Sequence, residues 1–235
     1  MSFSCSIFPL GDAALTVDFG NKIDDAVNDY VLQLFQKLQG FSSSITDLVP
    51  AYGSLTVYYN VLALRSKERS AFEAMKALIE PLLQESKKDE NVARRTLRIP
   101  VCYAKEFALD INDLAAQKNM AVEDVIGLHA AKTYRVYMIG FLPGFAYMGK
   151  VDERIATPRK PQPRTSVPAG SVGIAGEQTG VYPMASPGGW NIIGRTPLKL
   201  FDAKRDEPVL LQPGDDVSFY SITEDEFENY QSRNA

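Results

Sequence analysis

The spacing of hydrophobic residues in the first 90 positions switches between that of strands and that of helices. Short alternating apolar runs predict strands, and apolar residues three or four positions apart predict amphipathic helices. The expected elements, in chain order, are strands 4–10 and 14–19, helix 23–38, strands 45–49 and 55–59, and helix 67–85. We expect Asn21 and Gly40 to bound the first helix, and Pro81 to kink or break the second. This order, ββαββα, predicts a small open sheet with both helices on one face.

A polar and charged segment at 85–91 follows these elements and has no apolar periodicity. Such composition is typical of an exposed linker between domains. We therefore expect an N-terminal α/β domain at 1–90 and a second domain at 91–235.

The second domain opens with a strand and two helices and then becomes a series of short strands. The expected elements are strand 95–103, helices 111–118 and 122–131, and strands 134–139, 172–175, 190–193, 198–201, 209–211 and 217–222. Pro100 suggests an edge position or a bulge in the first strand, and Asp110 is the expected cap of the first helix. Many short strands joined by Gly and Pro turns predict a closed or nearly closed β-barrel, and the whole chain is expected to be α+β.

Composition narrows the range of partners and compartments. The chain has 235 residues and a net charge of −4, which disfavours nucleic acid and anionic membranes as partners. Cys5 and Cys102 are isolated cysteines, which is typical of a reduced, cytoplasmic compartment and gives no metal-like spacing, so no metal is expected. No apolar run approaches the roughly 20 residues of a membrane helix, and the N-terminus lacks the pattern of a signal peptide.

Most of the Gly and Pro residues lie between 138 and 201, together with the only tryptophan, Trp190. Polar side chains carried on rigid turns are a common way to build a site, so this stretch is the candidate functional region. The segment 144–150 (GFAYMGK) nearly matches a phosphate-binding P-loop. However, Val151 stands where that motif needs Ser or Thr, and no helix opening follows, so we reject a P-loop here.

Charged and aromatic residues in and near this stretch each allow two interpretations. His129, the only histidine, shares a helix face with three aliphatic residues, so it is either a satisfied core residue or a proton donor at a pocket floor. Arg159, Lys160 and Arg164 flank two prolines and either hold a carboxylate or form a solvated basic loop. Trp190 is either core or a pocket wall.

Two further positions complete the set of candidates that the residues suggest. Gln178 and Thr179 are expected at a turn after strand 172–175, where they would act as hydrogen-bond donors or acceptors. Arg195, between a glycine and a Thr-Pro pair, is a second candidate for holding an anion.

Three long motifs resemble those of one protein family: GFLPGFAYMG at 140–149, PRKPQPRTSVPAGSVGIAGEQTGVYP at 158–183 and SPGGWNIIGRTP at 186–197. This is the carboxyltransferase subdomain C and D family, also called the allophanate hydrolase subunit 1 family. Its members include the B-type subunit of the bacterial ATP-dependent 5-oxoprolinase and the sporulation kinase inhibitor KipI. The resemblance covers nearly the whole chain. It implies a small ferredoxin-like α/β N-terminal domain and a cyclophilin-like β-barrel C-terminal domain.

The same resemblance implies an activity and partners. The chain would hydrolyse 5-oxo-L-proline, a cyclic amide, to L-glutamate with subunits A and C, would be inactive alone, and could form a homo-oligomer. ATP would be the cofactor, with its site shared with or located on a partner subunit. The resemblance fixes the motif positions, and the chemistry of the side chains suggests a catalytic set and a substrate-binding set among them. The catalytic set is His129, Gln178 and Thr179, and the substrate-binding set is Arg164, Arg195, Phe145, Tyr182 and Trp190.

Two other functions stay open at this point. A KipI-like protein would bind and inhibit a sensor histidine kinase, which makes a kinase the alternative partner. The barrel type alone also suggests a prolyl isomerase, although a fold by itself is a poor guide to function.

Overall fold

The computed structural model describes residues 4–84 and 94–233, and the chain divides into two compact units, Met1–Ala93 and Arg94–Ala235. The linker expected at 85–91 lies outside the described residues. Both cysteines are free thiols. Across the described ranges, every helix is too short or too polar to cross a membrane.

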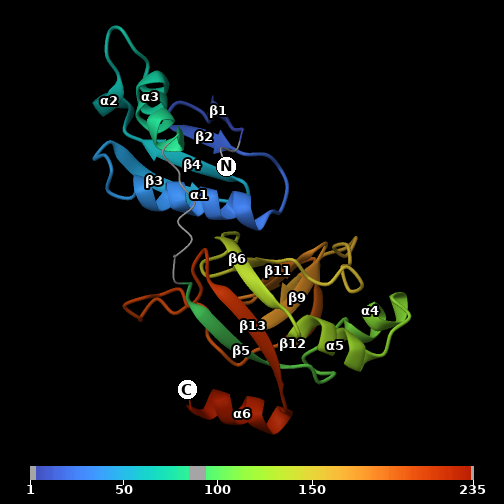
Figure 1. Cartoon of the computed structure of the whole chain (residues 1–235). Coiled ribbons are helices and arrows are strands. Elements are labelled where there is room, and N and C mark those ends of the chain that lie inside the picture. The colour runs from blue at the N-terminus through green and yellow to red at the C-terminus, as the bar shows by residue number, and fades with distance from the viewer. Residues whose placement is uncertain (1–3, 85–93, 234–235) are drawn as a thin grey trace. The chain divides into compact units, whose positions relative to one another are not determined.

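The N-terminal unit contains an antiparallel four-stranded sheet in the order β1-β2-β4-β3 (Figure 1). Its strands are β1 (Ser6–Pro9), β2 (Ala14–Asp18), β3 (Ile45–Pro50) and β4 (Ser54–Tyr59). The predicted hairpin at the start of the chain is confirmed, since β1 pairs with β2 from Ser6 opposite Asp18 to Pro9 opposite Leu15. Gly11, in the turn, has a φ of 66°, a value that favours glycine.

Two long helices cover one face of this sheet, as the sequence predicts. They are α1 (Asp25–Leu38) and α3 (Ala71–Gln84). Residues one position apart in a strand point to opposite faces, so alternate residues of β2 and β4 reach the same core as both helices. That core contains the fully buried side chains of Leu15, Val17, Val31, Leu34, Leu55, Val57, Met75 and Ile79.

The helix ends differ from the predicted ones. Asp24, rather than Asn21, caps α1, and its carboxylate accepts hydrogen bonds from the backbone N–H groups of Ala26 and Val27. The helix α3 begins at Ala71 because Ser70 and Glu73 form a reciprocal capping box. The predicted break at Pro81 is wrong, since α3 continues through it to Gln84. A short helix that the sequence pattern missed, α2 (Val61–Leu64), precedes α3.

The strand order of the N-terminal unit bears on the ferredoxin-like assignment. A ferredoxin-like domain has the chain order βαββαβ and ends on a strand. Here β2 lies between β1 and β4. Strand β1 precedes β2 in the chain and forms one edge of the sheet. The ferredoxin-like assignment therefore stays a prediction, while the mixed α/β character is confirmed.

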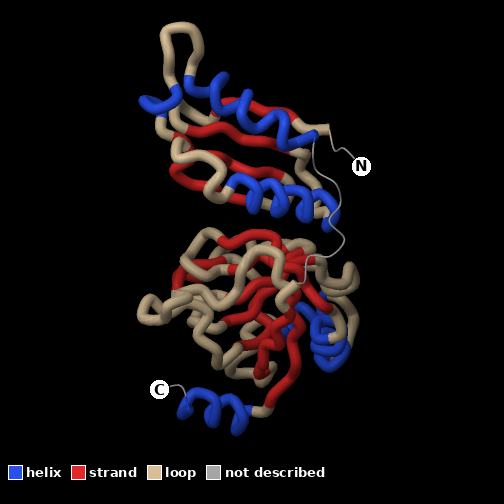
Figure 2. Tube along the Cα trace, turned by 60° about the vertical axis from the view of Figure 1, so that its left-hand side comes forward, coloured by secondary structure: helices blue, strands red, loops and turns tan. Residues whose placement is uncertain are grey.

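A closed barrel of seven strands forms the second unit, as predicted, in the order β10-β7-β6-β13-β5-β12-β9 (Figures 1 and 2). Its strands are β5 (Thr96–Cys102), β6 (Thr133–Ile139), β7 (Ala146–Gly149), β9 (Ser171–Ala175), β10 (Gln178–Val181), β12 (Asn191–Arg195) and β13 (Asp216–Ile222). A separate two-stranded sheet pairs β8 (Arg164–Val167) with β11 (Ser186–Gly188).

Several strand predictions need correction. Pro100 is not at a sheet edge, because β5 lies inside the barrel between β13 and β12. Proline has no backbone N–H to donate to a neighbouring strand. This is tolerated at Pro100 because β5 pairs with β12 only at Cys102, opposite Arg195. The segments 198–201 and 209–211 form one isolated bridge, Phe201 to Val209, rather than strands. The sequence pattern missed β7, β8, β10 and β11.

Two helices close one side of the barrel and a third follows its last strand. Helix α4 (Ile111–Gln117) and helix α5 (Val122–Ala130) lie side by side, and α4 contacts β12 while α5 contacts β13 (Figures 1 and 2). The chain ends in α6 (Glu224–Arg233), which contacts β5. The side chain of Asp110, at the start of α4, makes no capping hydrogen bond, so its predicted capping role is wrong.

Pro81→Ala tests the cost of a proline inside α3. Pro81 cannot donate to the carbonyl one turn earlier, so alanine should raise the free energy of unfolding by about 1–3 kcal/mol. The measurement is urea unfolding of the full chain followed by helical circular dichroism. The exposed neighbouring position Glu80→Ala serves as control and should change stability by no more than about 0.5 kcal/mol. Unchanged or lower stability in Pro81→Ala would contradict the prediction.

Candidate functional site

His129 lies in a buried chain of hydrogen bonds that runs from Tyr103 to the carbonyl of Gly173. Its Nδ1 lies 3.0 Å from the Tyr103 hydroxyl and its Nε2 lies 3.0 Å from Thr179 Oγ1. Thr179 Oγ1 in turn donates to the carbonyl of Gly173 at 3.1 Å. Because that hydroxyl proton is already used, Thr179 accepts from Nε2–H, and Nδ1 accepts from Tyr103. The histidine is therefore neutral, with both ring nitrogens occupied.

Burial makes protonation of this histidine unfavourable. The imidazole is fully buried and stacks on Phe219 and Tyr134, with ring centroids 4.6 and 5.4 Å away. Loss of solvent lowers the pKa of His129 from 6.5 to about 3. These surroundings match a satisfied core histidine, one of the two interpretations that the sequence allowed.

An aromatic cluster, defined here as Phe145, Tyr147, Tyr182 and Trp190, lies on the outer side of the barrel wall. Phe145 is its centre and meets Tyr147, Tyr182 and Trp190 edge to face, with centroids 4.8, 5.2 and 5.4 Å away. Edge-to-face contacts at these separations are favourable for aromatic rings. The structure thus brings together three predicted substrate-binding residues, Phe145, Tyr182 and Trp190.

Glycines in the neighbouring strands make room for these rings. A Cβ at Gly180 would lie 2.9 Å from the carbonyl oxygen of Ala146 and 3.1 Å from the ring of Trp190. A Cβ at Gly188 would collide with the phenol of Tyr182. Since Thr179 and Val181 face the barrel core, Gly180 faces outward, and the bare backbone there lets Trp190 pack against the wall.

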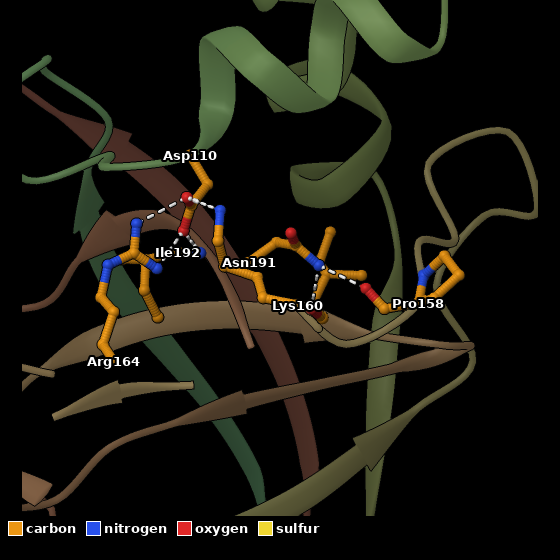
Figure 3. Close-up of polar contacts among 7 residues, drawn as sticks. Asp110, Pro158, Lys160, Arg164, Asn191 and Ile192 are labelled. Carbon is orange, nitrogen blue, oxygen red and sulfur yellow. Dashed lines mark hydrogen bonds and ion pairs between the residues drawn. The ribbon is translucent and has the colours of Figure 1, made fainter. Parts of the chain in front are cut away.

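A cluster of charged residues, Asp110 with Lys160 and Arg164, lies at the junction of α4, β8 and β12 (Figure 3). Arg164 donates two hydrogen bonds to the Asp110 carboxylate, at 2.9 and 2.6 Å, and Lys160 Nζ donates a third at 2.7 Å. The backbone N–H of Ile192 donates a fourth at 2.7 Å. Only 2% of the Asp110 side chain is exposed, against 28% for Lys160 and 26% for Arg164.

These contacts fix the ionisation of Asp110. Burial on its own would raise the pKa of this carboxyl. The hydrogen bonds from Arg164, Lys160 and the Ile192 backbone outweigh burial and lower the pKa below its ordinary value. Asp110 is therefore a carboxylate at neutral pH, and its paired charge is one that a buried position can tolerate.

The basic segment is held by its backbone as well as by Asp110. Asn191 Nδ2 donates to the carbonyl of Pro158 at 2.8 Å (Figure 3). The backbone N–H of Lys160 donates to the carbonyl of Gly189 at 2.8 Å. Arg159 extends over Trp190, with its guanidinium carbon 5.9 Å from the ring centroid. The segment is thus a positioned part of the fold and not a freely solvated loop.

The arginines lie beside the aromatic cluster, whose members Phe145, Tyr182 and Trp190 are buried. Burial raises the pKa of Tyr182, and the positive charges of Arg159 and Arg164 oppose that increase. Arg159 likewise opposes the raised pKa that burial gives Tyr147. Both arginines are therefore close enough to the cluster to act on its hydroxyl groups electrostatically.

The remaining predicted site residues lie elsewhere. Arg195 Nε donates to the Ala169 carbonyl at 2.7 Å, and its guanidinium lies 6.0 Å from the Phe107 ring centroid. Gln178 is half-buried at the start of β10, and Thr179 is a buried residue of that strand, so neither lies in the turn that the sequence suggested. The predicted catalytic pair His129 and Thr179 does come together, inside the barrel wall.

Sequence reasoning missed Asp110, Tyr103 and Tyr147 as parts of these clusters. Asp110 precedes a helical pattern, which favours a cap, and its actual partners lie 50 and 54 residues away along the chain. No local signal marks such a pairing. The P-loop was rightly rejected, because 146–149 of that segment form strand β7. No group of three or more His, Cys, Asp or Glu side chains in 4–84 and 94–233 could hold a metal ion.

The family model for the carboxyltransferase domain, subdomain C and D, matches residues 5–211. The chain belongs to this family. A protein of Bacillus subtilis (strain 168), named as the B-type subunit of 5-oxoprolinase, is 43% identical, covering 98% of this chain and 98% of that protein. The protein of the same name in Escherichia coli O157:H7 is 39% identical, and the match covers 89% of this chain and 93% of that protein.

A solved structure extends the likeness to the fold. The Kluyveromyces lactis urea carboxylase superimposes with a TM-score of 0.78 over 98% of this chain and 23% of its own, at 21% identity. At that identity the likeness concerns the fold alone. The matched region is about a quarter of the urea carboxylase chain, so the same fold occurs there within a much longer protein.

Replacing His129 by Gln tests the neutral-histidine network through pH. The unfolded chain protonates its histidine near pH 6.5, whereas the folded protein resists protonation down to about pH 3. The unfolded state therefore binds more protons in this window, so stability is complete above pH 6.5 and falls as pH decreases. We expect the native protein to lose about 1 kcal/mol between pH 7 and pH 5.5, measured by urea unfolding.

The His129→Gln variant should lose less stability over the same interval, because no other histidine titrates there. Thr179→Ser keeps both the hydroxyl and the histidine and should retain the native pH dependence. An equal pH dependence in His129→Gln and the native protein would contradict the prediction.

Gly180→Ala tests the packing of Trp190 on the barrel wall. The added Cβ must displace either Trp190 or the β7 backbone, so the free energy of unfolding should fall by about 1–3 kcal/mol. Tryptophan fluorescence during urea unfolding is specific to this region, because Trp190 is the only tryptophan. Gly127→Ala, in α5 with nothing within 4 Å of the new Cβ, is the control and should stabilise the protein by up to about 1 kcal/mol. Equal stabilities of the Gly180→Ala and native proteins would argue against this packing.

Proposed function

We propose that this chain is the B-type subunit of an ATP-dependent 5-oxoprolinase, which hydrolyses 5-oxo-L-proline to L-glutamate together with subunits A and C. The observation that carries this proposal is the 43% identity to the Bacillus subtilis protein of that name, spread over 98% of both chains. Identity over the full length of both proteins includes the barrel, the helices and the Gly/Pro-rich stretch, rather than one shared motif.

The geometry that supports a role in substrate binding is on the outer side of the barrel. There an aromatic cluster lies beside Arg159, Lys160 and Arg164. Phe145, Tyr182 and Trp190 are buried, so they would back the site, and the partly exposed cations would meet the ligand. Sites for small molecules commonly combine apolar and aromatic side chains with a few placed polar groups. We propose that the substrate-binding residues are Arg164, Phe145, Tyr182 and Trp190, and that Arg195 supports the turn at Ala169 instead.

The proposed catalytic residues differ in their exposure to solvent. Gln178 is partly exposed at the end of a barrel strand, where it remains available to an amide. His129 and Thr179 are enclosed and fully bonded, which favours a structural contribution to the barrel wall. We therefore propose that this chain binds and orients substrate, and that the chemical step depends on residues of the partner subunits.

ATP would supply the activation of an otherwise unreactive lactam. The segment resembling a P-loop is strand β7 and offers no phosphate-binding loop, so we assign no ATP contact to the described residues. We infer that the nucleotide binds at a site on, or shared with, a partner subunit. We also infer a cytoplasmic location, a cyclophilin-like type for the barrel and a ferredoxin-like type for the N-terminal sheet.

Inhibition of a histidine kinase, the alternative that the family resemblance raises, draws no support from the contacts described above. It therefore stays a prediction, and the enzyme subunit is the function that we propose.

Co-expression with subunits A and C tests the proposed function. The complex should release glutamate from 5-oxo-L-proline in an ATP-dependent way, and omission of this chain should reduce release to the background rate. A complex completed with the Lys204→Gln variant, which alters one exposed residue of the loop between Phe201 and Val209, should retain activity. Glutamate release that persists without this chain would overturn the proposal.

A further inference from the structure

Lys160 and Arg164 retain hydrogen-bonding capacity after their contacts with Asp110. Arg164 uses two of its N–H groups on the carboxylate and Lys160 uses one. A guanidinium has five N–H donors and an ammonium has three. Within the described ranges, Asp110 is the acceptor of every side-chain hydrogen bond that these two residues make. The remaining donors, on side chains about a quarter exposed, are free for a ligand.

The local charge favours an anion of one negative charge. Two cations against one carboxylate leave a net charge of +1 in the Asp110 cluster. Arg159, which is exposed and lies over Trp190, adds a further positive charge at its margin. An anion that binds here finds charge-assisted hydrogen bonds, which are shorter and stronger than neutral ones.

The framework around these donors is already ordered without a ligand. Asp110 is bound to β12 twice, through its own N–H to the Ile192 carbonyl at 2.8 Å and through the Ile192 N–H to its carboxylate at 2.7 Å. Asp110 in turn holds the two cations, so their long side chains have little freedom left to lose on binding. Preorganisation of this kind strengthens binding by reducing its entropic cost.

We propose that Lys160 and Arg164, held in place by Asp110, bind the carboxylate of a small amide substrate, with Arg159 as an additional contact. Asp110 is then a positioning residue, which acts on the ligand through the two cations. This inference rests on the proposed function, since 5-oxo-L-proline carries one carboxylate beside its ring amide. It deepens that function by assigning the carboxylate to this cluster and not to Arg195, whose Nε is bonded to Ala169.

Trp190 fluorescence offers a direct test in the full chain, because the only tryptophan lies beneath Arg159. The chain is titrated with 5-oxo-L-proline, with 2-pyrrolidinone, which has the same ring without the carboxylate, and with inorganic phosphate. We expect a saturable change with 5-oxo-L-proline and none with 2-pyrrolidinone. Saturation by phosphate alone, an equal response to 2-pyrrolidinone, or no saturable response to any probe would each overturn the proposal.

Single substitutions test whether 5-oxo-L-proline binds at the Asp110 cluster. Lys160→Gln should weaken 5-oxo-L-proline binding roughly 10- to 100-fold, because it removes a charge-assisted hydrogen bond. Arg159→Gln, outside the Asp110 cluster and exposed, should weaken it roughly 3-fold without disturbing the fold, and Lys204→Gln should leave it unchanged. Native-like affinity in both Lys160→Gln and Arg159→Gln, with Trp190 still responding, places the carboxylate elsewhere and overturns the assignment.

Kinetics of the assembled complex distinguish failure of the carboxylate site from failure of the proposed function. In the assembled complex, Lys160→Gln should raise the KM for 5-oxo-L-proline by a similar factor while kcat changes less, since it removes substrate binding. A complex that needs this chain for glutamate release, but whose KM is unchanged by Lys160→Gln, would retain the proposed function and refute the carboxylate site.

Discussion

One buried carboxylate determines the arrangement of the outer side of the barrel. Asp110 lies at the start of α4 and accepts hydrogen bonds from Arg164, Lys160 and the backbone of Ile192. Lys160 and Arg164 come from one basic segment, whereas Ile192 belongs to strand β12. Loss of either cation would remove charge-assisted hydrogen bonds from Asp110, and loss of both would leave an uncompensated buried charge, which is strongly unfavourable. The helix, the strand and the basic segment are therefore mutually dependent.

The barrel wall separates two kinds of polar chemistry. On its inner side, Tyr103, His129, Thr179 and the Gly173 carbonyl form a neutral chain in which every donor has an acceptor. On its outer side, charged groups pair and also face solvent. A neutral, satisfied network suits a low-dielectric core, whereas charges that keep partial exposure can exchange partners with a ligand. Burial thus distinguishes the enclosed histidine from the partly exposed cations to which we assign substrate binding.

Sequence periodicity located the long helices because their signal is local. The apolar spacing of 23–38 and 122–131 corresponds to α1 and α5, and the many short strands corresponded to a closed barrel. Strands β7, β8, β10 and β11 have three or four residues each and contain or adjoin Gly and Pro, so their patterns were too short to recognise. Two of their pairings, β7 with β10 in the barrel and β8 with β11 outside it, join strands that are far apart in the chain.

The candidate site was predictable in its residue types but not in its contacts. Family motifs pointed to Phe145, Arg164, Tyr182 and Trp190, and the structure does gather these on one side of the barrel. The family positions also include His129 and Thr179, whose side chains are buried and hydrogen-bonded to each other on the inner side of the barrel wall. A motif position can thus serve either substrate contact or the support of a neighbouring strand, and sequence alone does not distinguish the two.

The two sides of the wall are joined through a single strand. Thr179 of β10 faces the core and bonds to His129, while the next residue, Gly180, faces outward and carries Trp190 against its backbone. Any shift of β10 would therefore disturb the inner network and the aromatic cluster together. The inner network is hydrogen-bonded throughout, and His129 and Thr179 are fully buried, so it holds β10 in place. Through this coupling, His129 and Thr179 would influence the proposed binding region by positioning β10.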